Sequence, residues 1–344
     1  MSEDQKDFSK LVDLVMSNPT LSVMRPVVEK ELLHYEIFQA LDADGLLKDI
    51  VFQGGTSLRL CRGSDRFSED LDFAGGTDFS AESMRPIKEC LEKRIGERFG
   101  LNVDVSNKPA KVGEDGIPHV RVDKWWISIE TMPENRAMPR QRIKLEIANI
   151  PAHTRELIPI RTNYDVLAGM PTVLVNAESM DEIMADKVLA FPTSLLDNQG
   201  RPVPPDSAKI RHRDIWDLAW MSTRGARLDP QMVVAKIGDY GLVHYPNLAD
   251  RAIEQIPHIV KSREFKAQMT RFIDSATVAR TVAIEAYVDY LAMSVTGLFT
   301  QMKTALADMQ QAAQPFAPTA TFAPAAPDKA TAKSTRKQHP PRSR

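Results

Sequence analysis

Short segments in which apolar and polar residues alternate predict the strands of a β-sheet in the first half of the chain. Over residues 141–149 the alternation is strict, and this is the period of a strand with one buried face. Shorter apolar runs predict the remaining strands: residues 49–53, 70–74, 101–105, 120–131 and 172–175. We therefore expect an α+β fold built on a mixed sheet.

Apolar residues at helical spacing predict helices around this sheet and throughout the second half of the chain. The expected helices are residues 8–16, 26–41, 80–99 and 178–191, followed by a helical pattern from residue 214 to about residue 310. Residues 191–207 contain four prolines and cannot form one helix. The expected organisation is N-terminal helices capping the sheet (1–48), a catalytic core (49–191), a helical C-terminal domain (192–312) and a tail (313–344).

The composition indicates a cytoplasmic protein with no membrane partner. A chain of 344 residues is long enough for two domains with apolar cores. No apolar run approaches the roughly 18 residues that a membrane span needs, and the N-terminus has no signal-peptide pattern. The two cysteines, Cys61 and Cys90, fit no metal spacing and favour a reducing compartment. The seven scattered histidines form no ligand cluster.

The tail at residues 313–344 differs sharply in composition from the rest. It is rich in Pro, Ala, Thr, Lys and Arg, which cannot bury enough apolar surface to fold. Six Lys and Arg residues against one Asp give it a net charge of +5, so the remainder carries −2 − 5 = −7. A disordered basic arm of this kind either contacts nucleic acid or only keeps the protein soluble, and both interpretations stay open.

A double glycine follows the first predicted strand. Gly54 and Gly55 allow the backbone to approach a ligand closely. A helix that begins near Thr56 or Ser57 directs its free N–H groups toward an anion. This segment therefore predicts a phosphate-binding turn.

Two carboxylates lie on the next predicted strand. Alternate side chains of a strand point to opposite faces, so Asp70 and Asp72 share one face. Leu71 and Phe73 point the other way, into a core. Adjacent carboxylates repel each other, and Mg²⁺, which prefers oxygen ligands, explains their position best. A phosphate turn beside metal ligands indicates a nucleoside triphosphate (NTP) as ligand.

This ordered combination resembles a known family. Gly-Gly-Thr-Ser-Leu-Arg-Leu, followed by Arg-Phe-Ser-Glu-Asp-Leu-Asp-Phe, is similar to the first motif of the AbiEii/AbiGii toxin family, a branch of the polymerase-beta-like nucleotidyltransferase superfamily. The resemblance spans residues 51–221. It implies the superfamily's mixed sheet with flanking helices, and an enzyme that uses Mg²⁺ or Mn²⁺ to transfer a nucleoside monophosphate from an NTP to an acceptor.

Two later segments extend the resemblance. A two-metal site needs a third carboxylate from a neighbouring strand, and Glu146 stands at the family's second motif. The alternative is a Lys144–Glu146 ion pair on a solvated face. Lys187 lies in the apolar stripe of its helix, where a lysine either extends to water or reaches into a cleft. The family's third motif implies that Lys187 holds the triphosphate, whereas Asp186 is expected at the surface.

A further motif lies at residues 209–221. Asp214 and Asp217 stand among apolar residues and need partners, which Arg211, Arg213 and Lys187 can supply. The Arg-Asp-x-x-Asp-Leu run resembles the family's fourth motif, which places Asp214 beside the catalytic lysine. Asp217 is the weaker candidate, and a purely structural ion pair remains an alternative.

The candidate site is one set of residues with distinct roles. The resemblance implies these assignments: Asp70, Asp72 and Glu146 as metal ligands, with Glu146 also as base; Gly54, Gly55, Thr56 and Ser57 around the phosphates; Lys187 on the triphosphate with Asp214 fixing it; and Arg66 beside the nucleotide, orienting the aspartate strand.

The acceptor follows from the resemblance and from charge. Family members act as toxins of toxin–antitoxin or phage-defence modules, with the antitoxin encoded next door, and some modify tRNA ends. Arg59, Arg62 and Arg66 lie beside the phosphate turn, and the fourth motif adds Arg211 and Arg213. This local positive charge would attract a polyanion. We therefore expect the 3′ end of a tRNA as acceptor. A protein or small-molecule hydroxyl is an alternative, as is a non-catalytic module that binds nucleotides or RNA.

Overall fold

The computed structural model describes residues 7–108, 120–132, 139–197, 199–242 and 244–313. The helices are α1 (Phe8–Met16), α2 (Arg25–Ala43), α3 (Gly54–Arg62), α4 (Ile87–Phe99), α5 (Met180–Thr193), α6 (His212–Thr223), α7 (Pro230–Asp239), α8 (Tyr245–Ile259), α9 (Arg263–Phe272), α10 (Ser275–Arg280) and α11 (Glu285–Ala313). The strands are β1 (Val51–Gln53), β2 (Leu71–Ala74), β3 (Asn102–Lys108), β4 (Val122–Glu130), β5 (Gln141–Ala148), β6 (Glu156–Pro159) and β7 (Leu174–Ala177).

The chain divides into two compact units, Met1–Leu306 and Ala307–Arg344. The sheet, α1 to α10 and most of α11 belong to the first unit. The predicted disordered tail begins at Ala313, where α11 ends, and the rest of it lies outside the described residues. No described helix is long and apolar enough to cross a membrane.

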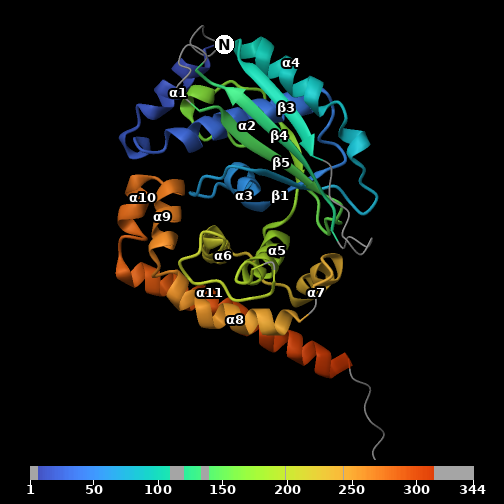
Figure 1. Cartoon of the computed structure of the whole chain (residues 1–344), viewed down its shortest axis with the longest axis vertical. Coiled ribbons are helices and arrows are strands. Elements are labelled where there is room, and N and C mark those ends of the chain that lie inside the picture. The colour runs from blue at the N-terminus through green and yellow to red at the C-terminus, as the bar shows by residue number, and fades with distance from the viewer. Residues whose placement is uncertain (1–6, 109–119, 133–138, 198, 243, 314–344) are drawn as a thin grey trace, which may run out of the picture. The chain divides into compact units, whose positions relative to one another are not determined.

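Seven strands of the described chain form one mixed sheet in the order β3-β4-β5-β2-β1-β7-β6 (Figure 1). β2 runs parallel to β5 and antiparallel to β1. Asp72 on β2 is the register partner of Glu146 on β5 and of Gln53 on β1. Partners in register point to the same face of a sheet, so these polar side chains form a row across its middle. The expected fold class, a mixed sheet with flanking helices and a helical C-terminal region, is confirmed.

The opposite face of the sheet packs against α2. Leu71 and Phe73 of β2 are 0% and 1% exposed, as the alternation predicted. The ring of Phe38 on α2 lies 4.9 Å from that of Phe52, and the ring of Phe52 lies 5.1 Å from that of Phe73. This apolar contact fixes which way β1 and β2 face, and it leaves the polar row on the side away from α2.

Helices α5 to α11 enclose a second apolar cluster on one side of the sheet (Figure 1). Its interior includes Val188 and Phe191 of α5, and the ring of Phe191 lies 5.9 Å from that of Phe299 on α11. α5 contributes one stripe of apolar side chains to this cluster. The other side of α5 is therefore available to contact the sheet.

Three elements differ from the sequence prediction. The helix predicted over residues 80–99 begins as a 3₁₀ turn at Ala81–Met84, and α4 starts only at Ile87. Pro86 explains the break, because proline lacks an N–H and restricts the residue before it. α5 continues through Pro192 to Thr193, two residues beyond its predicted end. β6 was not predicted, since its side chains are largely exposed on both faces and give no periodic signal.

A buried ion cluster joins α7 to the start of α5. Lys236 Nζ on α7 lies 2.7 Å from Glu182 Oε1, 3.1 Å from Glu178 Oε1 and 3.2 Å from Asp186 Oδ2. The side chains of Lys236 and both glutamates are 0% exposed. Burial, reinforced by Asp186, raises the pKa of Glu178 well above its usual range. The lysine is therefore the cation that makes this concentration of carboxyl groups tolerable.

We predict that Lys236→Met lowers the free energy of unfolding by roughly 3–5 kcal/mol, because it leaves buried carboxyl groups without their cation. Lys303→Met is the matched control, since Lys303 forms an exposed pair with Asp250 and such pairs contribute about 1 kcal/mol or less. Urea unfolding followed by circular dichroism measures both. Equal losses in the two variants would mean that the cluster does not hold α7 in place.

Candidate active site

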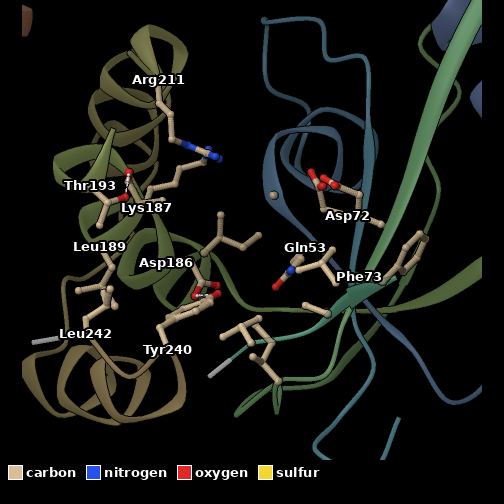
Figure 2. A pocket seen from close by; sticks show the side chains of 18 residues that line it. Gln53, Asp72, Phe73, Asp186, Lys187, Leu189, Thr193, Arg211, Tyr240 and Leu242 are labelled. Atoms are coloured by element: carbon tan, nitrogen blue, oxygen red, sulfur yellow. Dashed lines mark hydrogen bonds between the residues drawn. The ribbon is translucent and has the colours of Figure 1, made fainter. Parts of the chain in front are cut away.

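A cavity of about 350 Å³ lies between the polar row of the sheet and helices α5 to α7, a size suited to a small-molecule ligand. The residues that define it include Gln53, Gly54, Asp72 and Glu146 on the sheet side, and Asp186, Lys187, Arg211, Tyr240 and Leu242 on the helical side. Figure 2 shows Asp72 on one wall and Lys187 with Arg211 on the opposite wall. The first motif and the third and fourth motifs thus meet across one cavity.

The glycine pair opens α3, which begins at Gly54 rather than near Thr56. Gly54 has φ +77°, and a Cβ there would lie 2.9 Å from Asp72 Oδ2. A Cβ on Gly55 would overlap the guanidinium of Arg66. Both positions therefore require glycine for close approach, and Gly54 also requires it for its left-handed backbone conformation.

Thr56 and Ser57 do not line the cavity. Both are buried, at 1% and 0% exposure, and the Thr56 hydroxyl donates a hydrogen bond to the carbonyl of Asp70. Of the four residues of the predicted phosphate turn, Gly54 alone is among those lining the cavity in the described chain. The Thr56 hydroxyl group holds the turn to the aspartate strand, and the direct contact of Thr56 or Ser57 with phosphate stays a prediction.

Two of the three candidate carboxylates, Asp70 and Glu146, are paired with lysines. Lys144 Nζ lies 3.2 Å from Asp70 Oδ2 and 3.0 Å from Glu146 Oε2, and Lys124 Nζ lies 2.6 Å from Glu146 Oε1. The Lys144–Glu146 pair considered as an alternative is thus present. Burial, followed by the charges of Glu146 and Asp70, raises the pKa of Asp72 to about 6. The two lysines lower the pKa of Glu146, although burial opposes them.

The donor types fit a hard divalent cation. All three candidates offer carboxylate oxygens, the ligands that Mg²⁺ and Mn²⁺ prefer. Burial raises the pKa of Asp72 most, and the charges of Glu146 and Asp70, which a cation would offset, raise it further. Within the described residues, however, no three His, Cys, Asp or Glu side chains are gathered as a group that could hold a metal ion. The chemistry therefore fits a metal, while Asp70 and Glu146 stand paired with lysines.

Lys187 belongs to a buried ion network on the opposite wall. Its Nζ lies 2.6 Å from Asp214 Oδ1 and 2.8 Å from Asp217 Oδ2. Arg66 donates to both oxygens of Asp217, each at 2.7 Å, and Arg211 Nε donates to Asp214 Oδ2 at 2.6 Å. Arg211 and Lys187 lower the pKa of Asp214 well below its usual range, against the effect of burial. Lys187 thus reaches into the cleft rather than out to water.

Residues 36–290 match the family described as nucleotidyl transferase AbiEii toxin of type IV toxin–antitoxin systems. The chain belongs to this family. Comparison with curated proteins gives no match. The chain is also similar to the solved structure of MenT4, a nucleotidyltransferase toxin from Mycobacterium tuberculosis H37Rv, with 18% identity, a TM-score of 0.47, and coverage of 87% of this chain and 98% of that one. JHP933 from Helicobacter pylori shares 16% identity, with a TM-score of 0.43 over 83% and 95% of the two chains.

This AbiEii-family chain is therefore a nucleotidyltransferase toxin of a type IV toxin–antitoxin system. The match starts within α2 and ends within α11, so it includes every residue that lines the cavity. The family resemblance inferred from the motifs is confirmed.

Two aspartates of this nucleotidyltransferase have more contacts than the sequence indicated. Asp217, the weaker candidate, is fully buried and binds both Arg66 and Lys187. Asp186, expected at the surface, lines the cavity and accepts hydrogen bonds from Tyr240 Oη at 2.9 Å and Lys236 Nζ at 3.2 Å. That prediction was wrong because α7 packs against α5 on this side, which no local pattern reveals.

The arginines of the first motif were also misjudged as free positive charge. Arg59 Nε lies 2.8 Å from Glu31 Oε2, and Arg62 Nη2 lies 2.6 Å from Glu156 Oε2. Arg66 is 3% exposed and is held by Asp217, so it supports the aspartate network from outside the cavity. The positive charge that lines the cavity belongs to Lys187 and Arg211, and of the five arginines expected to supply it, Arg211 is the one among the lining residues that the structure describes.

We predict that Asp72→Asn raises the free energy of unfolding of the metal-free protein by roughly 1–3 kcal/mol at neutral pH. The folded-state pKa of about 6 exceeds the usual 3.8, so the ionised carboxyl group destabilises the folded protein above pH 6. Wild-type protein regains this stability as the pH falls from 6 toward 3.8, and the advantage of the variant should vanish there. Denaturant titrations across this range measure the difference, with Asp250→Asn as an exposed control. A difference that does not change with pH would contradict the assignment.

Proposed function

We propose that this toxin uses Mg²⁺ or Mn²⁺ to transfer a nucleoside monophosphate from an NTP to the 3′ end of an RNA, most simply a tRNA. The observation that carries the proposal is the cavity in which Asp72 faces Lys187 and Arg211 (Figure 2). Glu146 also lines it. One wall offers oxygen ligands to a cation, and the other offers cations to a polyphosphate. Phosphoryl transfer depends on this combination of positioning and charge neutralisation.

In the proposed reaction each wall has its own task. Asp70, Asp72 and Glu146 would hold the metal, which supplies charge neutralisation and activates the attacking hydroxyl group. The acceptor oxygen attacks the α-phosphorus, and its proton passes to Glu146. The bond from the α-phosphorus to the bridging oxygen breaks, and pyrophosphate leaves with its charge facing Lys187 and Arg211.

The buried aspartates act as positioning residues. Asp214 and Asp217 hold the Lys187 ammonium group from two sides, so little of its freedom remains to be lost when the triphosphate binds. Arg66 in turn fixes Asp217 and packs against Gly55. This placement supports a role for Arg66 in orienting the first motif, while its assignment beside the nucleotide stays a prediction.

The other end of the cavity suits the ribose and the base. It combines apolar side chains with a few polar groups: Ile183, Leu189, Tyr240 and Leu242 with Gln53 and Asp186. Small-molecule sites commonly have this composition, in which apolar contacts supply affinity and polar groups set orientation. The proposal leaves open which of the four bases is preferred.

Two alternatives differ in what they predict for labelling. Incubation of the protein with each α-³²P-labelled NTP, Mg²⁺ and total cellular RNA should label the 3′ end of an RNA, and added salt should suppress this. Label on a protein or a small molecule instead would establish a different acceptor hydroxyl. Binding of NTP with no release of pyrophosphate to any acceptor would indicate a non-catalytic nucleotide-binding module. A neighbouring antitoxin gene is implied by the family and is tested by co-expression.

We expect Asp72→Asn to reduce RNA labelling on the order of 10²-fold or more, because it removes a metal-binding charge at the reacting phosphate. Thermal unfolding should show the variant folded. The surface variant Asp250→Asn controls for loss of a carboxylate elsewhere, and it should label RNA at the wild-type rate. Labelling by Asp72→Asn at that same rate would overturn the site assignment.

Lys187 and Asp214 should behave as one unit. Lys187→Ala removes the cation that faces the triphosphate and should abolish most activity. Asp214→Ala should cost less, because Asp217 still holds the ammonium group at 2.8 Å. The double variant should therefore be little worse than Lys187→Ala alone. Measured rate losses that simply multiply would show that the two residues act independently.

A further inference from the structure

A second cavity, of about 180 Å³, lies beside α6. Helical geometry places its residues Trp216 and Thr223 on the side of α6 away from Asp214 and Asp217, since each residue advances the helix by about 100°. One helix therefore carries the catalytic ion network on one side and this cavity on the other. At about half the volume of the catalytic cavity, it is too small for a complete NTP.

A row of aromatic rings leads out of this second cavity. The ring of Trp216 lies 5.9 Å from that of Tyr287, and the ring of Tyr287 lies 5.7 Å from that of Tyr290. Trp216 is 3% exposed, whereas Tyr290 on α11 is 38% exposed. The ring of Trp220 is covered by the Arg224 guanidinium at 5.4 Å. Successive rings are tilted by 43° and 51°, so the row ends at the cavity mouth in one partly open ring, that of Tyr290.

The polar groups of this cavity are mainly hydrogen-bond donors. Arg224 and Arg280 are exposed and form no ion pair with any residue that the structure describes. The indole N–H groups of Trp216 and Trp220 are buried, and neither has a hydrogen-bond partner within the described part of the chain. Unpaired buried donors are uncommon in folded proteins. One acidic residue, Asp65, also lines the cavity, against the two arginines. The arginines and the unpaired indole N–H groups make the site a better match for an acceptor-rich, anionic ligand than for a cation.

We propose that this second cavity binds one nucleotide of the single-stranded end of an RNA. The base stacks on Tyr290, with Tyr287 behind that ring, and its phosphate contacts Arg224 and Arg280. Stacking platforms combined with arginine are how proteins hold single strands without reading their sequence. The inference rests on the proposed transfer to RNA, because it assigns the site to the acceptor. An acidic peptide would satisfy the arginines and leave the aromatic row without a role.

Direct binding can be measured without catalysis. A short single-stranded RNA carrying 5-bromouridine is photo-cross-linked to the full chain in the absence of NTP and metal, and mass spectrometry locates the adduct. We expect it on Tyr287 or Tyr290, with competition by unlabelled RNA and weaker competition by a nucleoside monophosphate or inorganic phosphate. An adduct elsewhere overturns the proposal. Equal competition by the monophosphate and the RNA also overturns it, because the ligand is then a free nucleotide.

Variants separate this site from the catalytic cavity. Tyr290→Ala should raise the KM for RNA roughly 5- to 100-fold, the effect of losing one stacked base, with kcat and NTP affinity unchanged. Tyr290→Phe keeps the ring and should restore wild-type KM. Arg224→Gln should weaken binding and reduce the slope of log affinity against log salt by about 0.7. Arg227→Gln, an exposed arginine on the same loop outside the cavity, is the matched control.

The outcomes distinguish this proposal from the proposed function. Cross-linking at Tyr290 without NTP-dependent labelling of any RNA would retain the RNA site and reject transfer to RNA. Labelling of RNA with unchanged KM in Tyr290→Ala would retain the transfer and reject the site. A protein partner whose binding is lost in Tyr290→Ala, while RNA binding stays intact, would also reject it. Thermal unfolding of each variant checks that the fold is preserved.

Discussion

The structure depends on a requirement for charge pairing around Asp217. This carboxylate is fully buried and binds Arg66 from the first motif and Lys187 from α5. A buried charge that loses its partner costs several kcal/mol, so three segments distant in sequence must stay in contact. The same network explains why Gly55 has no side chain, because the Arg66 guanidinium occupies that space. The position of the first motif relative to α5 and α6 follows from electrostatics as much as from apolar packing.

Most charged groups on each wall of the cavity are paired with groups of opposite charge on the same wall. Lys124 and Lys144 pair with Glu146 and Asp70 on the sheet, and aspartates pair with Lys187 on the helical side. In the proposed reaction, a metal–triphosphate complex would bring a cation toward the carboxylates and anions toward the lysine. Substrate binding would thus exchange internal ion pairs for contacts with the ligand, and Asp72, with its raised pKa, is the carboxyl group with the most to gain from a nearby cation.

Sequence analysis predicted the parts that depend on local periodicity and failed where distant segments decide. The alternation over residues 141–149 located β5 and put Glu146 on its polar face. The structure makes Glu146 the register partner of Asp72 on the neighbouring strand. The family motifs correctly brought Lys187 next to Asp214. Asp217 is central because it binds Arg66, and Asp186 is half-buried because Lys236 of α7 contacts it. Both partners lie far away along the chain. The local sequence also cannot predict whether the arginines of a cluster are paired with acidic residues, because those partners come from other elements.

The attachment of α7 has a consequence for how such toxins could diversify. Lys236 anchors α7 to α5, and Tyr240 follows at the C-terminal end of that helix, against the apolar end of the cavity. The ion network that holds Lys187 does not include α7. Changes in the α7–α8 segment could therefore reshape one end of the cavity while leaving the charged end intact. The residues that select the substrate and those that perform the chemistry could then change independently in evolution. Exchange of the α7–α8 segment between family members would be a practical route to altered nucleotide preference.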